Sequence, residues 1–184
     1  MATGVLLICV GKATKQFDQL LQFKKTYEGI ILLGQTTDTD DIEGKILEEK
    51  TVPNIEQERI QALFADFEGE IEQVPPRYSA LKVGGRSMYQ LARKGVVFTP
   101  QARQVLVYQA EILKWESPEI HFRITCGRGT YMRSIARDIG EKLQTGGTLK
   151  ALTRTSIGPY TIEEALTLQD LQHELAANGS IQNN

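Results

Sequence analysis

The chain has 184 residues, 41% of them hydrophobic, and a formal net charge of only −2, which predicts one domain with room for a small appendage. Cys9 and Cys126 lie in apolar runs without paired spacing, and the only histidines are His121 and His173, so a disulfide framework and a zinc site are both disfavoured. The longest apolar run, Val5 to Val10, is too short to span a membrane. We therefore expect a soluble, cytoplasmic protein with reduced thiols and no signal peptide.

Hydrophobic periodicity predicts the elements of the first third of the chain. The apolar residues 1–11 predict a buried strand or extended run, and residues 25–34 predict a strand with Tyr27 on its polar side. A short strand near Ile46 follows the polar loop at 36–41. Helical spacing predicts two helices, at 12–22 with Ala13, Phe17, Leu20 and Leu21 inward, and at 56–67 with Ile60, Leu63, Phe64 and Phe67 on one face.

The remaining elements are predicted from prolines, glycines and spacing. Two prolines keep residues 74–82 extended, and Gly84-Gly85 turns the chain into a helix at 87–94. Further strands are expected at 96–98, 105–115, 120–126 and 149–157, and short terminal helices at 163–166 and 168–176. This mixture predicts an α+β fold in which one domain covers residues 1–176 and a disordered polar tail covers 177–184.

The stretch from Cys126 to Gly140 predicts an interior strand, a tight glycine turn and a helix that opens near Thr130, whose hydroxyl is expected to cap it. Arg128, Arg133 and Arg137 crowd the N-terminal half of this helix, where the helix dipole favours anions instead. Three cations at the helix end that favours anions are a locally unfavourable arrangement, and such an arrangement indicates a functional site. A helical wheel places Arg133 and Tyr131 beside the apolar stripe, where they can line a pocket. The alternative is a solvated, arginine-rich helix, and these residues alone leave both interpretations open.

Charges are sorted along the chain. Residues 32–72 contain twelve acidic residues and three basic ones, whereas residues 73–110 contain no acidic residue and six basic ones, Arg77, Lys82, Arg86, Arg93, Lys94 and Arg103. Because Tyr78 and Tyr89 are interleaved with these cations, the segment predicts a nucleic-acid-binding face. The alternatives are that an acidic face of the same fold neutralises it, or that it binds an acidic protein partner.

Motifs along nearly the whole chain together resemble the TruB family of pseudouridine synthases. They occur in the family's order at 2–6, 11–15, 25–27, 33–41 with Gly44, 74–82, 129–138, 154–155 and 158–160. The resemblance implies a mixed, largely antiparallel sheet with flanking helices, and a cleft that takes one uridine flipped out of the T-loop of tRNA, at position 55. It implies isomerisation to pseudouridine through an aspartate nucleophile, without metal or cofactor, by a monomer.

The resemblance also implies roles for particular residues. Arg133 would pair with the catalytic aspartate, and Tyr27 would stack on the uracil and accept the proton from its carbon 5. Tyr131 and Leu152 would line the substrate pocket. The cations expected along the RNA are Lys82, Arg86, Arg128 and Arg154.

The sequence departs from the family pattern at its front. The family's Gly-Thr-Leu-Asp-Pro motif, which carries the nucleophile, directly precedes the run that here begins Met1-Ala-Thr-Gly4. We therefore expect an N-terminally truncated catalytic domain that is inactive as given. The alternative is a non-catalytic RNA-binding remnant or tRNA chaperone. Smaller departures are Thr153, where many members carry arginine, and a C-terminus too short for the extra RNA-binding domain of some members.

Overall fold

The computed structural model describes residues 2–96 and 98–177 and has the α+β fold that the sequence predicts. Its strands are β1 (Ala2–Gly4), β2 (Lys25–Leu33), β3 (Gln35–Thr37), β4 (Ile46–Glu49), β5 (Gly69–Gln73), β6 (Lys82–Val83), β7 (Arg86–Ser87), β8 (Arg103–Glu116), β9 (Glu119–Cys126), β10 (Gly147–Ile157) and β11 (Tyr160–Thr161). Its helices are α1 (Phe17–Gln22), α2 (Gln57–Ala65), α3 (Met88–Arg93), α4 (Met132–Lys142) and α5 (Leu168–Ala177), with 3₁₀ helices η1 (Gly11–Gln16) and η2 (Ile162–Glu164).

The main sheet has seven strands, in the order β1-β10-β2-β9-β8-β5, with β11 paired to β10. β1 runs parallel to β10 and the other pairs of this sheet are antiparallel, which confirms the mixed, largely antiparallel sheet. β2 lies between β9 and β10, so Tyr27 is opposite Ile124 on one side and Arg154 on the other. Hydrogen bonding on both sides holds the backbone of Tyr27 in place.

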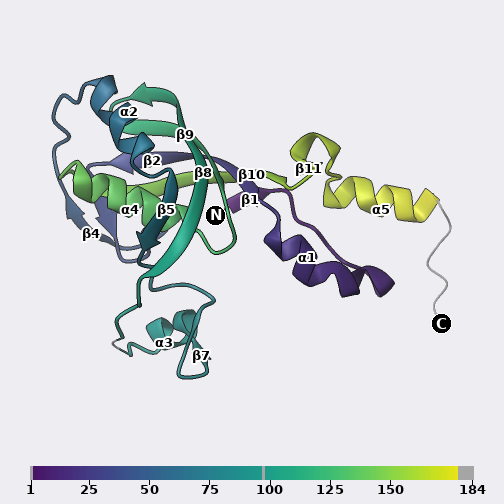
Figure 1. The fold of residues 1–184 in the computed structure, drawn as a ribbon. Helices are drawn as coiled ribbons and strands as arrows, with labels where there is room; N and C mark the ends of the chain where they lie inside the picture. Colours follow the sequence, from purple (N-terminus) through teal and green to yellow (C-terminus); the bar gives the residue numbers. More distant parts are fainter. Residues whose placement is uncertain (1, 97, 178–184) are drawn as a thin grey trace.

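One face of the sheet is covered by α2 and α4, and the core lies between them and the strands (Figure 1). On β9, Ile120, Phe122, Ile124 and Cys126 are all buried, as the period-two pattern predicts. The apolar stripe of α4 packs against this face, and Ile135, Ala136 and Ile139 are fully buried. The helix predicted at 56–67 is confirmed as α2, with its expected apolar residues buried, namely Ile60, Leu63, Phe64 and Phe67.

The opposite face of the sheet is polar. Arg123 on β9 lies between two carboxylates on neighbouring strands, with Nη2 at 2.7 Å from Glu28 Oε1 and Nη1 at 3.5 Å from Glu111 Oε2. The difference between the two faces explains why both core helices pack on the same side, since the buried apolar side chains of β9 lie on that side, whereas the opposite face mixes charged residues with a few apolar ones such as Ile30 and Leu113.

The N-terminal segment contradicts the prediction of a buried strand at residues 1–11. Strand β1 is only three residues long and exposed, and of the apolar run that follows it only Val5 is buried. Leu6, Ile8 and Val10 are 70%, 67% and 76% exposed. The hydrophobicity of the run predicted burial, but Leu6 and Ile8 only line a hollow that they share with α5 and stay largely exposed, so the prediction is wrong.

Other local predictions need smaller corrections. The helix expected at 12–22 is split into η1 and α1, and neither Ala13 nor Phe17 points inward as expected, because this segment lies beside the sheet and not under it. Thr130 is not the cap of α4: the N-cap is Tyr131, and the Thr130 hydroxyl donates to the Gly127 carbonyl at 3.2 Å. Residues 96 and 98 are not in a strand, and residue 97 lies outside the described residues. Of the tail predicted at 177–184, residue 177 instead ends α5, and residues 178–184 lie outside the described residues.

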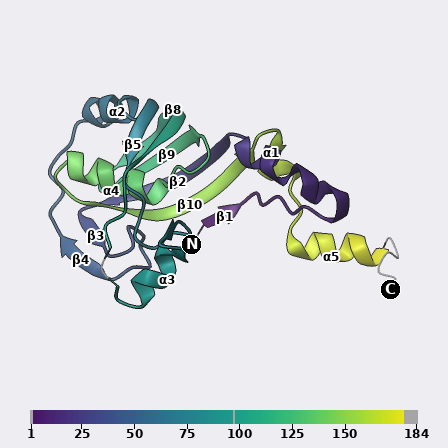
Figure 2. The ribbon, with the colours of Figure 1, turned by 60° about the horizontal axis from the view of Figure 1, so that its bottom comes forward.

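Two parts of the chain project from the sheet and its helices. The segment with α1 and the C-terminal segment with α5 extend together to one side, whereas α3 and the hairpin β6–β7 form a separate small lobe (Figure 2). The helix predicted after Gly84-Gly85 is confirmed as α3, and the Ser87 hydroxyl caps it by accepting from the Gln90 amide at 3.2 Å. Within the described residues, no helix combines the length and the apolar character that crossing a bilayer requires.

Candidate active site

A pocket of about 400 Å³ opens where β1, β2 and β10 meet the start of α4. It brings together four residues that the sequence singled out, namely Tyr27, Tyr131, Arg133 and Leu152, and with them Arg154, Ala2, Asp41, Thr130, Met132, Leu149, Lys150 and Ala151. The lining is part apolar and part cationic. The aromatic and apolar residues of such a concave site can contact a flat polar ring, and its arginines can bind a negatively charged group beside that ring.

Tyr27 reaches the pocket from the central strand β2. Burial raises the pKa of its phenol, and the adjacent Arg154 partly counteracts this rise. Arg154 lies directly opposite Tyr27 on β10, and its Nε donates to the carbonyl of Val5 at 2.7 Å. Arg154, predicted as an RNA-binding cation, is therefore placed in the pocket wall next to Tyr27.

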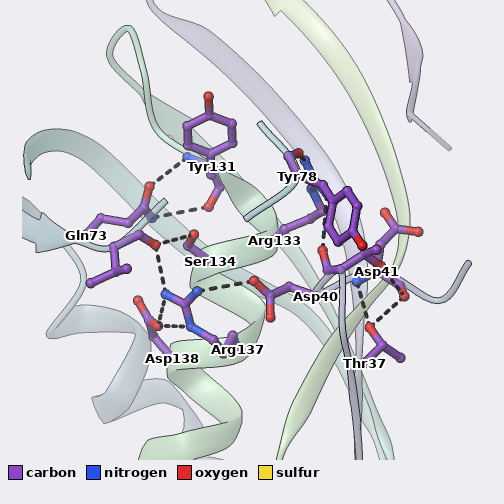
Figure 3. Close-up of polar contacts among 12 residues, drawn as sticks. Thr37, Asp40, Asp41, Gln73, Tyr78, Tyr131, Arg133, Ser134, Arg137 and Asp138 are labelled. Atoms are coloured by element: carbon purple, nitrogen blue, oxygen red, sulfur yellow. Dashed lines mark hydrogen bonds and ion pairs between the residues drawn. The ribbon is translucent and has the colours of Figure 1, made fainter. Parts of the chain in front are cut away.

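Tyr131 is held by Gln73 and Arg103, and neither of these contacts was predicted from the sequence. The buried side chain of Gln73 bonds the Tyr131 backbone twice, since its Oε1 accepts from the Tyr131 N–H at 2.8 Å and its Nε2 donates to the carbonyl at 3.2 Å (Figure 3). The guanidinium of Arg103 lies 5.4 Å from the centre of the Tyr131 ring and donates to the Gly129 carbonyl at 2.7 Å. Nothing in the sequence around Gln73 indicates that its side chain bonds the backbone of a residue 58 positions away.

Arg133 points from the first turn of α4 toward the pocket and is held by two backbone carbonyls. Its Nη1 donates to Thr39 O at 3.2 Å and its Nη2 to Tyr78 O at 2.7 Å. Among residues 2–96 and 98–177, no carboxylate lies within 4.0 Å of this guanidinium. Arg133 is therefore an oriented cation in a pocket wall, and the alternative of a freely solvated arginine is excluded.

Arg137, one helical turn further along α4, has carboxylate partners. Its Nη1 lies 3.2 Å from Asp40 Oδ2 and its Nη2 2.7 Å from Asp138 Oδ1 (Figure 3). Burial raises the pKa of both carboxyl groups, and the charge of Arg137 counteracts the rise. The same Nη2 also donates to the carbonyl of Val74 at 2.9 Å.

The loop that follows β3 is folded tightly against the pocket. The Thr37 hydroxyl accepts from the Asp41 N–H at 3.1 Å and donates to the Asp41 carbonyl at 2.8 Å. Asp40 has φ of 58°, a left-handed conformation that is uncommon for a residue other than glycine. The amide of Leu149 donates to the Asp40 carbonyl at 3.1 Å, which joins the loop to β10 and places Asp41 in the pocket lining. The acidic motif at 38–41 was the only sequence signal for this placement.

The other predicted cations lie outside this pocket. Lys82 and Arg86 are exposed on the hairpin β6–β7, and Arg128 is exposed in the turn before α4. The small lobe around α3 also carries aromatic groups beside cations: the Tyr78 and Tyr89 rings are 6.2 Å apart, and the Arg93 guanidinium lies 5.6 Å from the Tyr89 ring centre. These groups form a second surface that is separate from the pocket lining.

Neither the cysteines nor the acidic residues form a metal centre in the described part of the chain. The residues from 2 to 177, without residue 97, contain no group of three or more histidine, cysteine, aspartate or glutamate side chains arranged to hold a metal ion. Cys126 is buried in β9, and burial raises the pKa of its thiol to about 11. A protonated, buried thiol is a poor nucleophile, so Cys126 has a structural role.

Comparisons with known proteins identify relatives over nearly the whole chain. The sequence profile described as TruB family pseudouridylate synthase (N terminal domain) matches residues 1–132, and that described as tRNA pseudouridylate synthase B C-terminal domain matches residues 133–183. The boundary between the two profiles falls in the first turn of α4, whereas the main sheet continues past it, because β10 pairs with both β1 and β2.

Curated relatives and solved structures agree with these profiles. The tRNA pseudouridine synthase B of Clostridium perfringens (strain SM101) is 45% identical over 175 residues, 95% of this chain and 60% of the relative. That of Gloeothece citriformis is 48% identical over 174 residues, 93% of this chain and 56% of the relative. A chain in a crystal structure of a Cbf5-Nop10-Gar1 complex has a TM-score of 0.71 at 28% identity, covering 98% of this chain and 45% of that one. This chain thus spans about 60% of the length of such curated relatives.

Proposed function

Because the chain belongs to the TruB family of pseudouridine synthases, we propose that its pocket takes a uridine flipped out of tRNA, at position 55 of the T-loop, for isomerisation to pseudouridine. A base must leave the helical stack before an enzyme can reach its glycosidic bond, so a pocket of about 400 Å³ walled by two tyrosines suits this substrate. The reaction needs no metal or cofactor.

The observation that carries the proposal is the state of Arg133. Its guanidinium lines the pocket, its hydrogen bonds within the described residues go to two neutral carbonyls, and its charge also acts on Asp40 without a direct ion pair. A cation held in this way is ready to bind a carboxylate through a charge-assisted fork, which keeps the carboxylate ionised and aimed at the substrate. The family's nucleophile is an aspartate, which is the group that this site requires.

Strand β1 indicates where such an aspartate enters. Ala2 lines the pocket and is paired with Leu152 on β10, so the polypeptide at this end of β1 lies at the pocket. In the family, the Gly-Thr-Leu-Asp-Pro motif directly precedes the residues that match this stretch. We propose that this aspartate binds Arg133, and that a polypeptide of residues 1–184 alone does not catalyse the reaction.

The remaining steps use the residues of the pocket. The aspartate carboxylate attacks C1′ of the flipped nucleotide and displaces the uracil, whose N1 takes the electron pair of the glycosidic bond. The uracil turns, its carbon 5 bonds to C1′ and displaces the carboxylate, and loss of the carbon-5 proton with protonation of N1 completes the isomerisation. Tyr27 stacks on the uracil and receives the carbon-5 proton, while Tyr131 and Leu152 hold the ring. Burial raises the pKa of Tyr27 and so favours the neutral phenol, whereas Arg154 acts in the opposite direction and favours the phenolate, the form that can accept this proton.

The exposed cations extend the site along the RNA. Lys82 and Arg86 on the small lobe and Arg128 beside the pocket lie where they can neutralise phosphates of a folded tRNA. Tyr78 and Tyr89 offer ring faces next to them. We propose that the protein acts as a monomer in the cytoplasm, where tRNA is available.

The role of Arg133 can be tested in a version of this chain that is extended at its N-terminus by the segment of the Clostridium perfringens relative that carries the Gly-Thr-Leu-Asp-Pro motif. In this version Arg133→Ala should lower tritium release from carbon-5-labelled tRNA by about 10²- to 10³-fold, since it removes the group that orients the nucleophile. tRNA binding should change only a few-fold. The matched control is Arg123→Ala, which removes an arginine from the polar face of the sheet. Retained turnover in Arg133→Ala would show that Arg133 has no catalytic role.

The second candidate function, a non-catalytic RNA-binding protein, is favoured by the acid-free segment from 73 to 110. It predicts that residues 1–184 bind tRNA with a binding constant whose logarithm falls linearly with the logarithm of the salt concentration. It also predicts no turnover by the extended version. Turnover by the extended version would exclude it. Absence of both binding and turnover would contradict both functions.

A further inference from the structure

Arg133 and Arg137 lie one helical turn apart on the same side of α4, and their hydrogen bonds involve the same two neighbouring segments. One segment is the loop at 37–41 after β3, and the other is the stretch at 74–78 after β5. Arg133 donates to one carbonyl in each, at Thr39 and at Tyr78. Its orientation therefore depends on how firmly both segments are held.

Arg137 bonds to those same two segments. It donates to Asp40, which directly follows Thr39, and to the carbonyl of Val74, which begins the segment that contains Tyr78. Its Nε and Nη2 also donate to Asp138 Oδ1, at 2.9 and 2.7 Å, and this pairing fixes the plane of the guanidinium. Figure 3 shows Arg137 between Asp138 on one side and Asp40 on the other.

The burial of this cluster makes it more than a surface ion pair. The side chains of Arg137, Asp40 and Asp138 are only 20%, 17% and 25% exposed. Exposed pairs contribute little, whereas removing one partner of a largely buried pair leaves an uncompensated charge. Asp40 also has a left-handed backbone, which persists only if its surroundings hold it. Without Arg137, the Asp40 carboxylate would lose its hydrogen-bonded cation, and the loop would lose one of the contacts that hold it.

We propose that Arg137 is a positioning residue for Arg133: by binding Asp40 and the Val74 carbonyl, it fixes the two segments whose carbonyls aim the Arg133 guanidinium into the pocket. Ser134 assists on one side, since its hydroxyl donates to the same Val74 carbonyl at 2.8 Å. The catalytic meaning of this positioning rests on the proposed function. The structural coupling between the two arginines does not.

The first experiment measures the coupling in the 184-residue chain, without any reaction. Nuclear magnetic resonance of the arginine side chains reports whether rotation of the Arg133 Nη groups is restricted. Arg137→Met should average the separate Arg133 Nη–H signals and speed hydrogen exchange of the Asp41 amide, which bonds the Thr37 hydroxyl within the loop. The control Arg123→Met removes an arginine from the opposite face and should change neither signal.

The second experiment measures catalysis in the N-terminally extended version. Arg137→Met should lower kcat by about 10- to 100-fold and change KM less than about 3-fold, because a small displacement of an orienting group affects the transition state more than tRNA binding. Arg137→Lys keeps the charge without the planar fork, so its kcat should lie between those of the unchanged protein and Arg137→Met.

The outcomes separate the two hypotheses. If the extended parent shows no turnover, the proposed function fails, yet the Arg133 signals still test the coupling. If Arg137→Met lowers only the melting temperature, while the Arg133 signals and kcat stay within about 2-fold of the parent, Arg137 is structural and the inference is wrong. Should Arg137→Met not fold, Asp40→Asn replaces it, since it weakens the same contact while keeping the side-chain shape.

Discussion

The core helix α4 and the N-terminal arm at 5–22 are both rich in apolar residues, yet they have opposite fates. In α4, Ile135, Ala136 and Ile139 are fully buried in the core that this helix forms with the sheet. In the arm, Leu6, Ile8 and Phe17 are mostly exposed. The comparison teaches that apolar composition alone does not bury a segment. Helix α4 returns to the sheet through a tight turn, whereas the arm leaves β1 at the sheet edge and only borders a hollow that it shares with α5.

The largest expected difference between the two regions comes from the same substitution made in each. Phe122→Ala on β9 should lower the free energy of unfolding by about 3–5 kcal/mol, because it opens a cavity in a fully buried site. Phe17→Ala in the arm should change it by less than about 0.5 kcal/mol, because that ring is largely exposed. Urea titration of both variants measures this. Equal losses would mean that the arm is buried in solution.

A backbone contact of α4 offers a sharper test. Helix propensity alone predicts that Gly140→Ala stabilises the helix by about 1 kcal/mol. A Cβ at Gly140, however, would lie only 2.1 Å from the Gly147 backbone nitrogen, so we expect a loss of about 1–3 kcal/mol. Gln169→Ala in the exposed helix α5 is the control, and should be neutral or slightly stabilising. Stabilisation by Gly140→Ala would show that α4 and β10 are not so closely packed.

The smallest effect concerns the buried carboxyl groups next to α4. Because burial raises the pKa of Asp40 and Asp138 in the folded state, the fold holds their protons more tightly than the unfolded chain does. Their contribution to stability is full below the ordinary aspartate pKa of about 3.9 and is lost as pH rises through the raised folded values. Carboxyl carbon chemical shifts, followed during a pH titration, should give midpoints above that value for both. Midpoints below it would mean that Arg137 outweighs burial.

Local pattern was enough wherever one segment determined its own structure. The alternation at 119–126 and the spacing at 56–67 predicted β9 and α2 correctly, because each pattern needs only a period and one buried face. The pattern failed at residues 1–11 and at Thr130. At residues 1–11, burial depended on whether another part of the fold covers the segment. At Thr130, the hydroxyl that was expected to cap α4 donates instead to the Gly127 carbonyl.

In the candidate site, too, some residues could be predicted from the sequence and others could not. Motif resemblance singled out Tyr27, Tyr131, Arg133 and Leu152, and the pocket contains all four. Local pattern could not show that Gln73, Arg103 and the Arg137 cluster support these residues, because their partners are backbone groups or side chains far along the chain. A hydrogen bond between residues 58 or 97 positions apart leaves no local pattern.

By itself, then, the amino-acid order determined the α+β class, the period of the core elements β9, α2 and α4, and the choice of Tyr27, Tyr131, Arg133 and Leu152, which line one pocket. Only the tertiary structure decided which apolar segments are covered, that Arg154 lies opposite Tyr27, and that Arg133 bonds carbonyls of two loops joined by Arg137. The reason is physical: periodicity and propensity act over a few residues, whereas burial and the aim of a guanidinium depend on which distant segments the packed sheet brings together.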